Sequence, residues 1–444
     1  MKRILYILGV FVTVLLTGCD NSSGSTSTTS SVAQLTGFAF AANDSMPGLA
    51  QAVFTVEERI DTGLVWNKDS ILYGTKLDKV VPRFVFQSTP GAAWLTMPDT
   101  TCVLTGYDTL DFTQRPIYLT VRSSDRTVTK TYEIRATVHT VDPDLYTWTQ
   151  ICEGIYPPNE SEQRVVEKDG QFVMISSNGF ELNAYSSADG ASWTKTGQPS
   201  GLPAGTKVRQ IICDGTTLYY GQGNAVYTST DGLTWTAHST TFTIVTMLQY
   251  WNNECWLLVD KEGYELGWWQ TDSVALTGLR PDGEFPVSDF ATVTFSSASE
   301  RARSMIIGGF AENGKSLNTR WNFEYSSHTP ENKGYRMQEY SIDRPQFTSL
   351  TGVSVIWYNN QLLLFGGVDD QMSYFGRDIL YSTDEGLNWY PVDTTKNRLP
   401  EVYQARQKQT AIVRNNTIYL FGGQDKTTTY SDVYTGRLNS IDWQ

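Results

Sequence analysis

The stretch that decides the fold is AVYTSTDGLTWT, residues 225–236. Tyr227 begins a short strand-like run that ends in the turn Ser229-Thr230-Asp231-Gly232, and Trp235 follows the turn. Val, Tyr and Thr are enriched in strands, whereas Ser, Asp and Gly are typical of the tight turns that connect strands. The phrase therefore predicts a β-hairpin, and it recurs along the chain.

Five other segments repeat this phrase. Two close copies are AYSSADGASWTKT (184–196) and LYSTDEGLNWYPV (380–392), and three weaker copies are WWQTDSVAL (268–276), EYSSHTPENKGYRM (324–337) and VYTGRLNSIDW (433–443). The aromatic anchors of the six copies lie 41 to 57 residues apart, at Tyr185, Tyr227, Trp268, Tyr325, Tyr381 and Tyr434. Repeats of this length are typical of propeller blades, so we expect a six-bladed β-propeller over residues 145–444.

A second phrase precedes three of the anchors. It is an apolar strand that ends in two glycines, as in SMIIGGF (304–310), LLLFGGV (362–368) and IYLFGGQ (418–424), and it resembles the kelch repeat. The S-x-D-x-G-x-x-W pattern, complete at Ser382–Trp389, resembles the Asp-box of sialidases. That resemblance implies a turn held by Ser and Asp side chains, away from any catalytic centre. These aspartates are therefore not expected to be catalytic.

The two ends of the repeat region predict how the ring closes. The chain ends at Gln444, before the last repeat has a fourth strand, and TWTQIC (147–152) upstream is a strand without a blade. An N-terminal strand that completes the last blade would remove an open sheet edge. We therefore expect residues near Trp148 to pair with the last strand of the chain.

Residues 34–141 have a different pattern. Short strands of period two follow one another, as in PIYLTV (116–121) and TYEIRATVH (131–139), and no helical period is present. This predicts an all-β domain, an Ig-like β-sandwich, in front of the propeller. The segment VDPDLY (141–146) marks the boundary.

The N-terminus has the features of a lipoprotein signal. Lys2 and Arg3 precede a 13-residue apolar run, too short to span a membrane, and Leu16-Thr17-Gly18-Cys19 resembles the lipobox of bacterial lipoproteins. We expect a signal peptide over residues 1–18, lipid attachment at Cys19 and a flexible Ser/Thr-rich tether over residues 19–33. The expected partner is thus the membrane, reached through the lipid, and the expected location is the bacterial outer membrane, on its periplasmic or surface side.

Composition argues against several function classes. The net charge is −13, and loss of Lys2 and Arg3 with the signal peptide would make it −15, so nucleic-acid binding is not expected. The remaining cysteines form no C-x-x-C pair, so we expect no metal site and favour free thiols over disulfides at Cys102, Cys152, Cys213 and Cys255. A calcium site at Asp369, Asp370 and Asp378 is disfavoured relative to solvated carboxylates.

Known propeller enzymes fit poorly. Sialidases have an Arg-Ile-Pro phrase, which this sequence lacks, and the copper of galactose oxidase requires two His and two Tyr. The only propeller histidines, His238 and His328, lie at different places in their repeats. We therefore expect no catalytic residue and no cofactor of a known type, although an enzyme with an unfamiliar site remains open.

Because no known catalytic set is recognised, we expect the rigid ring to function in binding. Successive turns of an antiparallel blade alternate between its two ends, so the Gly-Gly turns should share one face, here called the Gly-Gly face. Long connections on that face carry the residues expected to bind a glycan or a protein partner, namely Arg320, Trp321, Tyr325, Tyr374, Phe375 and Tyr430. The alternative is that these rings pack against neighbouring blades.

The whole mature chain resembles a Bacteroidota-type lipoprotein family of unknown function with an N-terminal sandwich and a six-bladed propeller. The resemblance implies an outer-membrane lipoprotein and supplies no activity. Our leading hypothesis is a non-catalytic binding protein. The alternatives are a glycosidase or lyase with an unrecognised site in the propeller centre, and a structural subunit of a surface complex.

Overall fold

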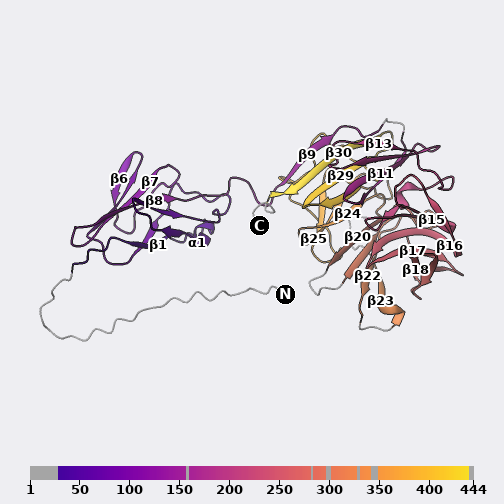
Figure 1. Cartoon of the computed structure of the whole chain (residues 1–444), viewed down its shortest axis with the longest axis horizontal. Coiled ribbons are helices and arrows are strands. Elements are labelled where there is room, and N and C mark those ends of the chain that lie inside the picture. The colour runs from indigo at the N-terminus through magenta and orange to yellow at the C-terminus, as the bar shows by residue number, and fades with distance from the viewer. Residues whose placement is uncertain are drawn as a thin grey trace. The chain divides into compact units, whose positions relative to one another are not determined.

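The computed structural model describes residues 29–156, 160–281, 284–296, 302–327, 331–341 and 349–439. The predicted signal peptide, Cys19 and most of the predicted tether lie outside these residues. The chain forms two compact units, residues 1–142 and 143–444, so the division falls within the VDPDLY segment (Figure 1). In the described part of the chain, no helix combines the length and apolar character needed to cross a membrane.

The N-terminal unit is built of strands in two sheets. Strands β1 (Leu35–Phe40) and β4 (Pro82–Phe86) pair in one sheet. The other sheet has the order β2-β3-β8-β7-β5-β6, with bounds β2 Thr55–Glu57, β3 Thr62–Trp66, β5 Ala92–Met97, β6 Thr100–Val103, β7 Ile117–Arg122 and β8 Thr129–Arg135. A single helical turn, α1 (Gly48–Gln51), follows β1.

The predicted hairpin of this unit is β7 and β8, which pair antiparallel with Tyr118 opposite Glu133. The apolar face of β7 is buried, since Ile117, Leu119 and Val121 are each at most 1% exposed. The prediction of an all-β domain is confirmed. Its finer assignment as an Ig-like sandwich stays a prediction.

The second unit is the propeller. Four of its sheets have four strands each: β10 (Glu162–Lys168), β11 (Gln171–Ser177), β12 (Leu182–Ser187) and β13 (Thr194–Gly197); β20 (Ala291–Ser296), β21 (Ala302–Ile307), β22 (Thr319–Tyr325) and β23 (Tyr335–Ser341); β24 (Ser354–Tyr358), β25 (Gln361–Phe365), β26 (Ile379–Ser382) and β27 (Tyr390–Pro391); β28 (Thr410–Arg414), β29 (Thr417–Gln424), β30 (Thr429–Leu438) and β9 (Tyr146–Cys152). The elements η1 (Val208–Gln210) and η2 (Glu331–Gly334) are short 3-10 turns.

A fifth sheet of six strands contains two blades. Its strands are β14 (Ile212–Cys213), β15 (Leu218–Ser229), β16 (Thr236–Trp251), β17 (Glu254–Asp260), β18 (Tyr264–Gln270) and β19 (Ser273–Leu276). It carries two of the six anchors, Tyr227 in β15 and Trp268 in β18. The long strand β16 is shared by the two repeats, because its first part pairs with β15 and its second part with β17. The count of six blades is therefore confirmed.

The ring closes as the sequence predicts. Strand β9 pairs antiparallel with β30, with Gln150 opposite Tyr434 and Trp148 opposite Gly436 (Figure 1). The approach is close, since a Cβ on Gly436 would lie 2.3 Å from the Trp148 ring. The first strand of the unit thus completes the blade formed by its last three strands.

The Gly-Gly doublets permit neighbouring blades to approach one another. Gly422 and Gly423 have φ of +47° and +109°, and the other two doublets also have positive φ at both residues. A Cβ on Gly422 would lie 1.9 Å from Nε2 of Gln163 in the next blade, and one on Gly366 would lie 2.3 Å from Nε2 of Gln409. Each glutamine donates Nε2 to the carbonyl just before the doublet, Phe421 O at 3.0 Å and Phe365 O at 2.6 Å. Both positive φ and this contact require glycine.

The S-x-D-x-G turns are held as expected from their side chains. In the turn after β15, Ser229 Oγ donates to Asp231 Oδ1 at 3.0 Å and accepts from Gly232 N at 2.9 Å. Asp231 Oδ1 also accepts from the backbone N–H groups of Leu233 and Thr234, and these bonds lower the pKa of Asp231. Equivalent bonds hold the turns at Asp189 and Asp384. These carboxylates are therefore structural.

We expect Gly422→Ala to destabilise the propeller more than a left-handed φ alone would. A residue with a Cβ loses about 1–2 kcal/mol in that conformation, and the overlap with Gln163 adds roughly 1–3 kcal/mol. The matched control is Gly314→Ala, because Gly314 has φ of +80° and nothing within 4 Å of its added Cβ. Urea unfolding midpoints measure both changes. Equal losses in the two variants would show that the blade contact is not what requires glycine.

Candidate functional site

Four of the six residues expected on loops of the Gly-Gly face lie in strands instead, three of them in β22 and Tyr430 in β30. Arg320, Trp321 and Tyr325 belong to β22, and Arg320 and Trp321 are only 1% and 3% exposed. The Trp321 ring packs 5.1 Å from that of Phe285 in the core. The loop placement was wrong because apolar and polar residues alternate from 319 to 325, which is the pattern of a strand. Trp321 is not available to a ligand at the surface.

Arg320 links two blades. Its Nη1 donates to Asn322 Oδ1 at 2.9 Å and to Glu385 O in the turn of the next blade, and its guanidinium lies 4.4 Å from the centre of the Tyr340 ring. Burial lowers the pKa of Arg320. This arginine is used in packing between blades.

The other three expected residues do lie beside the Gly-Gly turns. Tyr374 and Phe375 are half-buried on the loop after Gly367, and Phe375 packs against the neighbouring core. Tyr430 is half-buried near the start of β30, where it pairs with Gly423, and its hydroxyl donates to Asp425 Oδ2 at 2.6 Å. A ligand-binding role for these rings stays a prediction.

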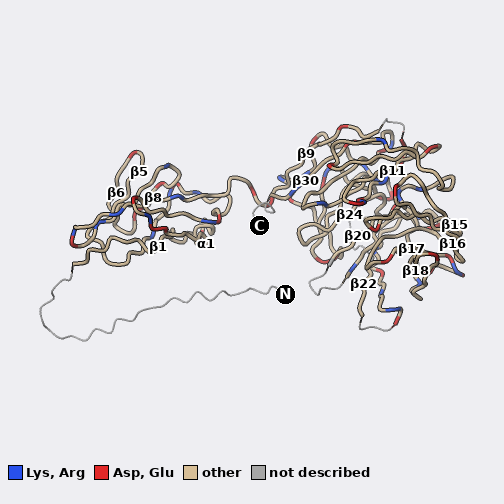
Figure 2. Tube along the Cα trace, viewed as in Figure 1, with Lys and Arg blue, Asp and Glu red and all other residues tan. Residues whose placement is uncertain are grey.

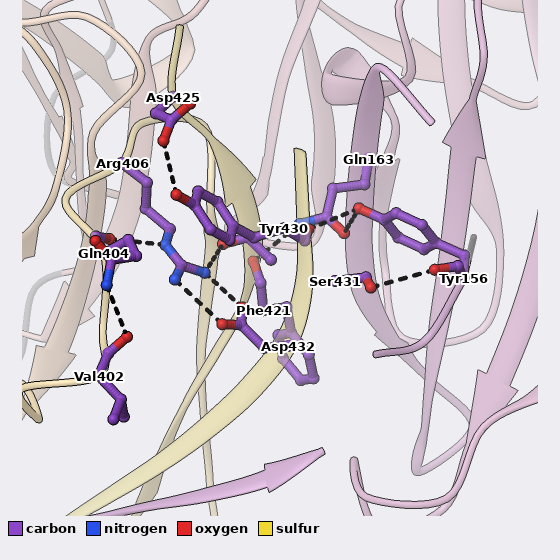
Figure 3. Close-up of polar contacts among 11 residues, drawn as sticks. Tyr156, Gln163, Val402, Gln404, Arg406, Phe421, Asp425, Tyr430, Ser431 and Asp432 are labelled. Atoms are coloured by element: carbon purple, nitrogen blue, oxygen red, sulfur yellow. Dashed lines mark hydrogen bonds and ion pairs between the residues drawn. The ribbon is translucent and has the colours of Figure 1, made fainter. Parts of the chain in front are cut away.

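Tyr430 belongs to a buried cluster around Arg406 (Figure 3). Arg406 is 1% exposed, and its Nε donates to Gln404 O at 2.9 Å. Its Nη1 donates to Gly422 O at 3.2 Å and to Asp432, and its Nη2 donates to Asp432 Oδ2 at 3.1 Å. The rings of Tyr403 and Tyr430 lie 4.2 Å and 3.9 Å from the guanidinium carbon. Burial alone would lower the pKa of Arg406, but Tyr403 and Asp432 outweigh it and raise this pKa.

The same cluster reaches the closing seam of the ring. Tyr156, just after β9, donates its hydroxyl to Gln163 Oε1 at 2.9 Å and to Tyr430 O at 2.8 Å (Figure 3). Ser431 Oγ donates to Tyr156 O at 3.3 Å. The last blade, its closing strand and the first blade therefore share one hydrogen-bond network. Because Arg406 is already paired and stacked, the cluster is a structural element.

A cavity of about 340 Å³ lies on the propeller axis. The innermost strand of every blade contributes to its wall, with Arg164, Ile212, Gln249, Thr292, Ser354 and Thr410 among the lining residues. Concave sites with a few convergent polar groups are the usual places where small ligands bind. This cavity is the candidate site.

A ring of polar contacts surrounds the mouth of the cavity on the Gly-Gly face. Asp289, Gly352 and Lys408 precede three inner strands and share a left-handed backbone. Gly352 N donates to Asp289 O at 2.9 Å, and Lys408 N donates to Gly352 O at 2.6 Å. Arg209 completes the ring, because its Nη1 donates to Lys408 O at 2.6 Å and its Nε to Asp289 Oδ1 at 3.2 Å. The Lys408 ammonium also lies 3.2 Å from Asp289 Oδ2.

The position of this ring follows from its neighbours. Gln407, next to Lys408, bridges to Gln424, and Ser288, next to Asp289, bridges to Phe310. Both partners directly follow a Gly-Gly doublet. The polar ring therefore lies inside the circle of Gly-Gly turns.

Arg164 differs from Arg320 and Arg406 in its contacts. It lies in β10, lines the cavity and is half-buried, and its Nε has no hydrogen-bond partner. Unlike those of Arg320 and Arg406, its guanidinium has neither a hydrogen bond nor an ion pair with any described residue. Burial and the nearby charge of Arg209 lower the pKa of Arg164 to about 10. The positive charge of Arg164 therefore has neither a counter-charge nor a hydrogen-bond acceptor among the described residues.

Two carboxylates line the cavity, and each already has a cation. Asp289 pairs with Arg209 and Lys408, and Glu167 lies 3.5 Å from Arg414. Gln249 is 5% exposed, and its Oε1 accepts no hydrogen bond from the described residues. The wall thus presents cationic donors and a free amide acceptor.

Four cysteines of the described residues are free thiols, and one of them, Cys213, lines the cavity. They are Cys102, Cys152, Cys213 and Cys255. Asp369 accepts hydrogen bonds from the backbone of Gln371 and Ser373, and Asp378 pairs with Arg398 at 2.8 Å. Among the residues with a described position, no group of three or more His, Cys, Asp or Glu could hold a metal ion.

The sequence did not identify Arg164 or Arg209. The repeated phrases cover the second and third strands of each blade, whereas the cavity is lined by the first strands, which differ from blade to blade. Arg164 is one of four charged residues in the strand Glu162–Lys168, so the local pattern does not single it out. Only the ring brings this stretch beside Arg209.

We expect Asp432→Ala to destabilise the protein by about 3–5 kcal/mol, because the buried Arg406 charge loses its carboxylate partner. The control is Asp378→Ala, which breaks a half-exposed ion pair and should cost at most about 1 kcal/mol. Urea unfolding at neutral pH measures both. A loss for Asp432→Ala no larger than the control would mean that the cluster does not stabilise the closing seam.

Comparison with known proteins agrees with this architecture. Residues 142–444 match the model of the DUF6242 beta propeller domain, and residues 25–136 match that of the DUF6242 N-terminal domain, a domain of unknown function. No curated protein matches. A solved structure described as the structure of YjhT has 14% identity and a TM-score of 0.46, and the match covers 64% of this chain and 96% of that one. Because the two models together span most of the sequence, this chain belongs to the DUF6242 family.

Proposed function

We propose that this chain is an exported, lipid-anchored protein whose propeller binds a glycan or a protein partner at its Gly-Gly face without catalysing a reaction. The axial cavity carries the proposal. It has a polar wall contributed by all six blades, and it holds an arginine without a partner. A rigid ring whose central cavity contains an unpaired positive charge is suited to binding a ligand.

Binding is favoured over hydrolysis because the carboxylates that line the cavity are already paired with basic side chains. Glycosidases that use two carboxyl groups require one as an acid and the other as a base or nucleophile. Both carboxylates that line this cavity, Glu167 and Asp289, instead hold basic side chains. Tyr374, Phe375 and Tyr430 lie beside the Gly-Gly turns and would extend the contact with a sugar or a peptide on that face.

The anchoring part of the proposal rests on the N-terminal sequence. We expect the full chain, expressed with its signal peptide in a Gram-negative host, to partition into the detergent phase with the membrane fraction. Cys19→Ser removes the thiol that would carry the lipid, so this variant should move to the aqueous phase. Cys102→Ser is the matched control and should stay with the membrane. Identical partitioning of all three proteins would exclude lipid attachment at Cys19.

Binding is tested with the full chain in detergent on a glycan panel and in pull-downs from membranes. For a ligand that spans the mouth, we expect Tyr374→Ala to weaken binding roughly twofold to tenfold, because an aromatic contact contributes ~0.5–1.5 kcal/mol. Tyr390→Ala is the control, since Tyr390 is 48% exposed on the outer strand β27. If Tyr374→Ala leaves the affinity unchanged, the loop that carries Tyr374 is not part of the binding site. If the protein cleaves a glycan of the panel, the proposal of a non-catalytic function is wrong and a glycosidase or lyase activity takes its place.

A further inference from the structure

The axial cavity has a local charge opposite to that of the protein. Acidic residues outnumber basic ones in the chain, 47 to 34, and the two kinds are interspersed along both units (Figure 2). Around the cavity the balance is reversed. Four basic residues, Arg164, Arg209, Lys408 and Arg414, lie at the wall or pair with it, against the two carboxylates Glu167 and Asp289.

The excess charge is concentrated at one end. Glu167 and Arg414 neutralise each other, and Arg209 and Lys408 share the single carboxylate of Asp289. The uncompensated charge is therefore that of these two residues and of Arg164, which has no carboxylate of its own among the described residues. These groups lie at the Gly-Gly mouth, where Arg164 is close enough to Arg209 to lower its pKa. Two guanidinium groups beside one another repel unless an anion lies between them.

Comparison with Arg406 shows what is missing at Arg164. Arg406 has a carboxylate, two backbone carbonyls and two aromatic rings around it. Arg164 has none of these within the described part of the chain. A half-buried cation without a partner is costly, and an external anion is the group that would satisfy it.

The rest of the wall indicates the neutral part of such a ligand. Gln249 Oε1 is a buried acceptor without a donor, so a hydroxyl group on a ligand would satisfy it. The side chains of Thr292 and Thr294 also line the cavity. A volume of about 340 Å³ suits a small molecule, not a polymer segment with many residues.

From this arrangement we infer that Arg164 and Arg209 bind the anionic group, a carboxylate or a phosphate, of a small hydroxylated ligand in the axial cavity. This inference rests on the proposed function and specifies the chemical class of its ligand. The anion lies at the Gly-Gly mouth, and the hydroxyl groups extend toward Gln249.

The test measures affinity by calorimetry with the full chain in detergent. The probes are glucuronate and galacturonate for the carboxylate, glucose 6-phosphate for the phosphate, and neutral glucose. We expect one anionic class to bind at least about tenfold more tightly than glucose, since a charged hydrogen bond contributes that much. Arg164→Gln should remove this preference, and Arg164→Lys should keep part of it. Arg398→Gln, at an exposed ion pair, is the control and should change nothing.

A second measurement separates ligand binding from a structural role. Without ligand, Arg164→Gln should raise the thermal unfolding midpoint, because it removes an unpaired, half-buried charge. Arg406→Gln should lower the midpoint, because that arginine is fully paired. A fall in the midpoint for Arg164→Gln would show that Arg164 supports the fold and would overturn the inference.

The remaining outcomes distinguish this inference from the proposed function. Equal binding of glucose and the anions, or anion binding unchanged by Arg164→Gln, would overturn the inference while leaving a binding function. No binding of any probe would also overturn it, and the glycan panel and membrane pull-downs would then decide separately whether the propeller binds anything. Loss of binding in the variant, together with a raised midpoint, would support both.

Discussion

The pairing of β9 with β30 is the contact on which the propeller depends. Each blade buries its faces against two neighbours, so the ring is stable only when the last blade meets the first. Without β9, the strand β30 would present a row of unpaired N–H and C=O groups along a sheet edge. Strand β9 pairs with these groups from Tyr146 to Cys152, and Tyr156 ties the same seam to Gln163 and to the backbone of Tyr430.

The same contact between neighbouring blades recurs around part of the ring. A Gly-Gly doublet ends the second strand, and a glutamine from the next inner strand lies against it and donates to the preceding carbonyl. Gly422 with Gln163 and Gly366 with Gln409 are two examples of this contact. The doublet also places its turn next to the ring of Asp289, Gly352 and Lys408. The feature that packs the blades therefore also shapes the mouth of the axial cavity.

Arg406 and Arg164, both near the Gly-Gly face, differ in how completely their charges are paired. Arg406 is enclosed and neutralised, so its contacts are complete and it stabilises one blade. Arg164 lies on the first strand of the ring, faces the cavity and lacks a partner. In a folded protein an incomplete polar group of this kind is costly, and it is more common at functional sites than elsewhere.

The sequence by itself determined the all-β class, the six repeats and the strand that closes the ring. Tyr227, Trp268 and the other anchors recur because each blade must build the same turn, and a local turn leaves a local pattern of Ser, Asp, Gly and Trp. Strand β9 was identified because a closed ring requires every blade to be complete. The same local reasoning failed for Arg320 and Trp321, whose alternating neighbours belong to a buried strand. The cavity was decided only by the tertiary structure. Arg164, Arg209, Asp289 and Lys408 lie far apart in the sequence and belong to neither of the two repeated phrases. The curvature of the ring is what brings their charges together.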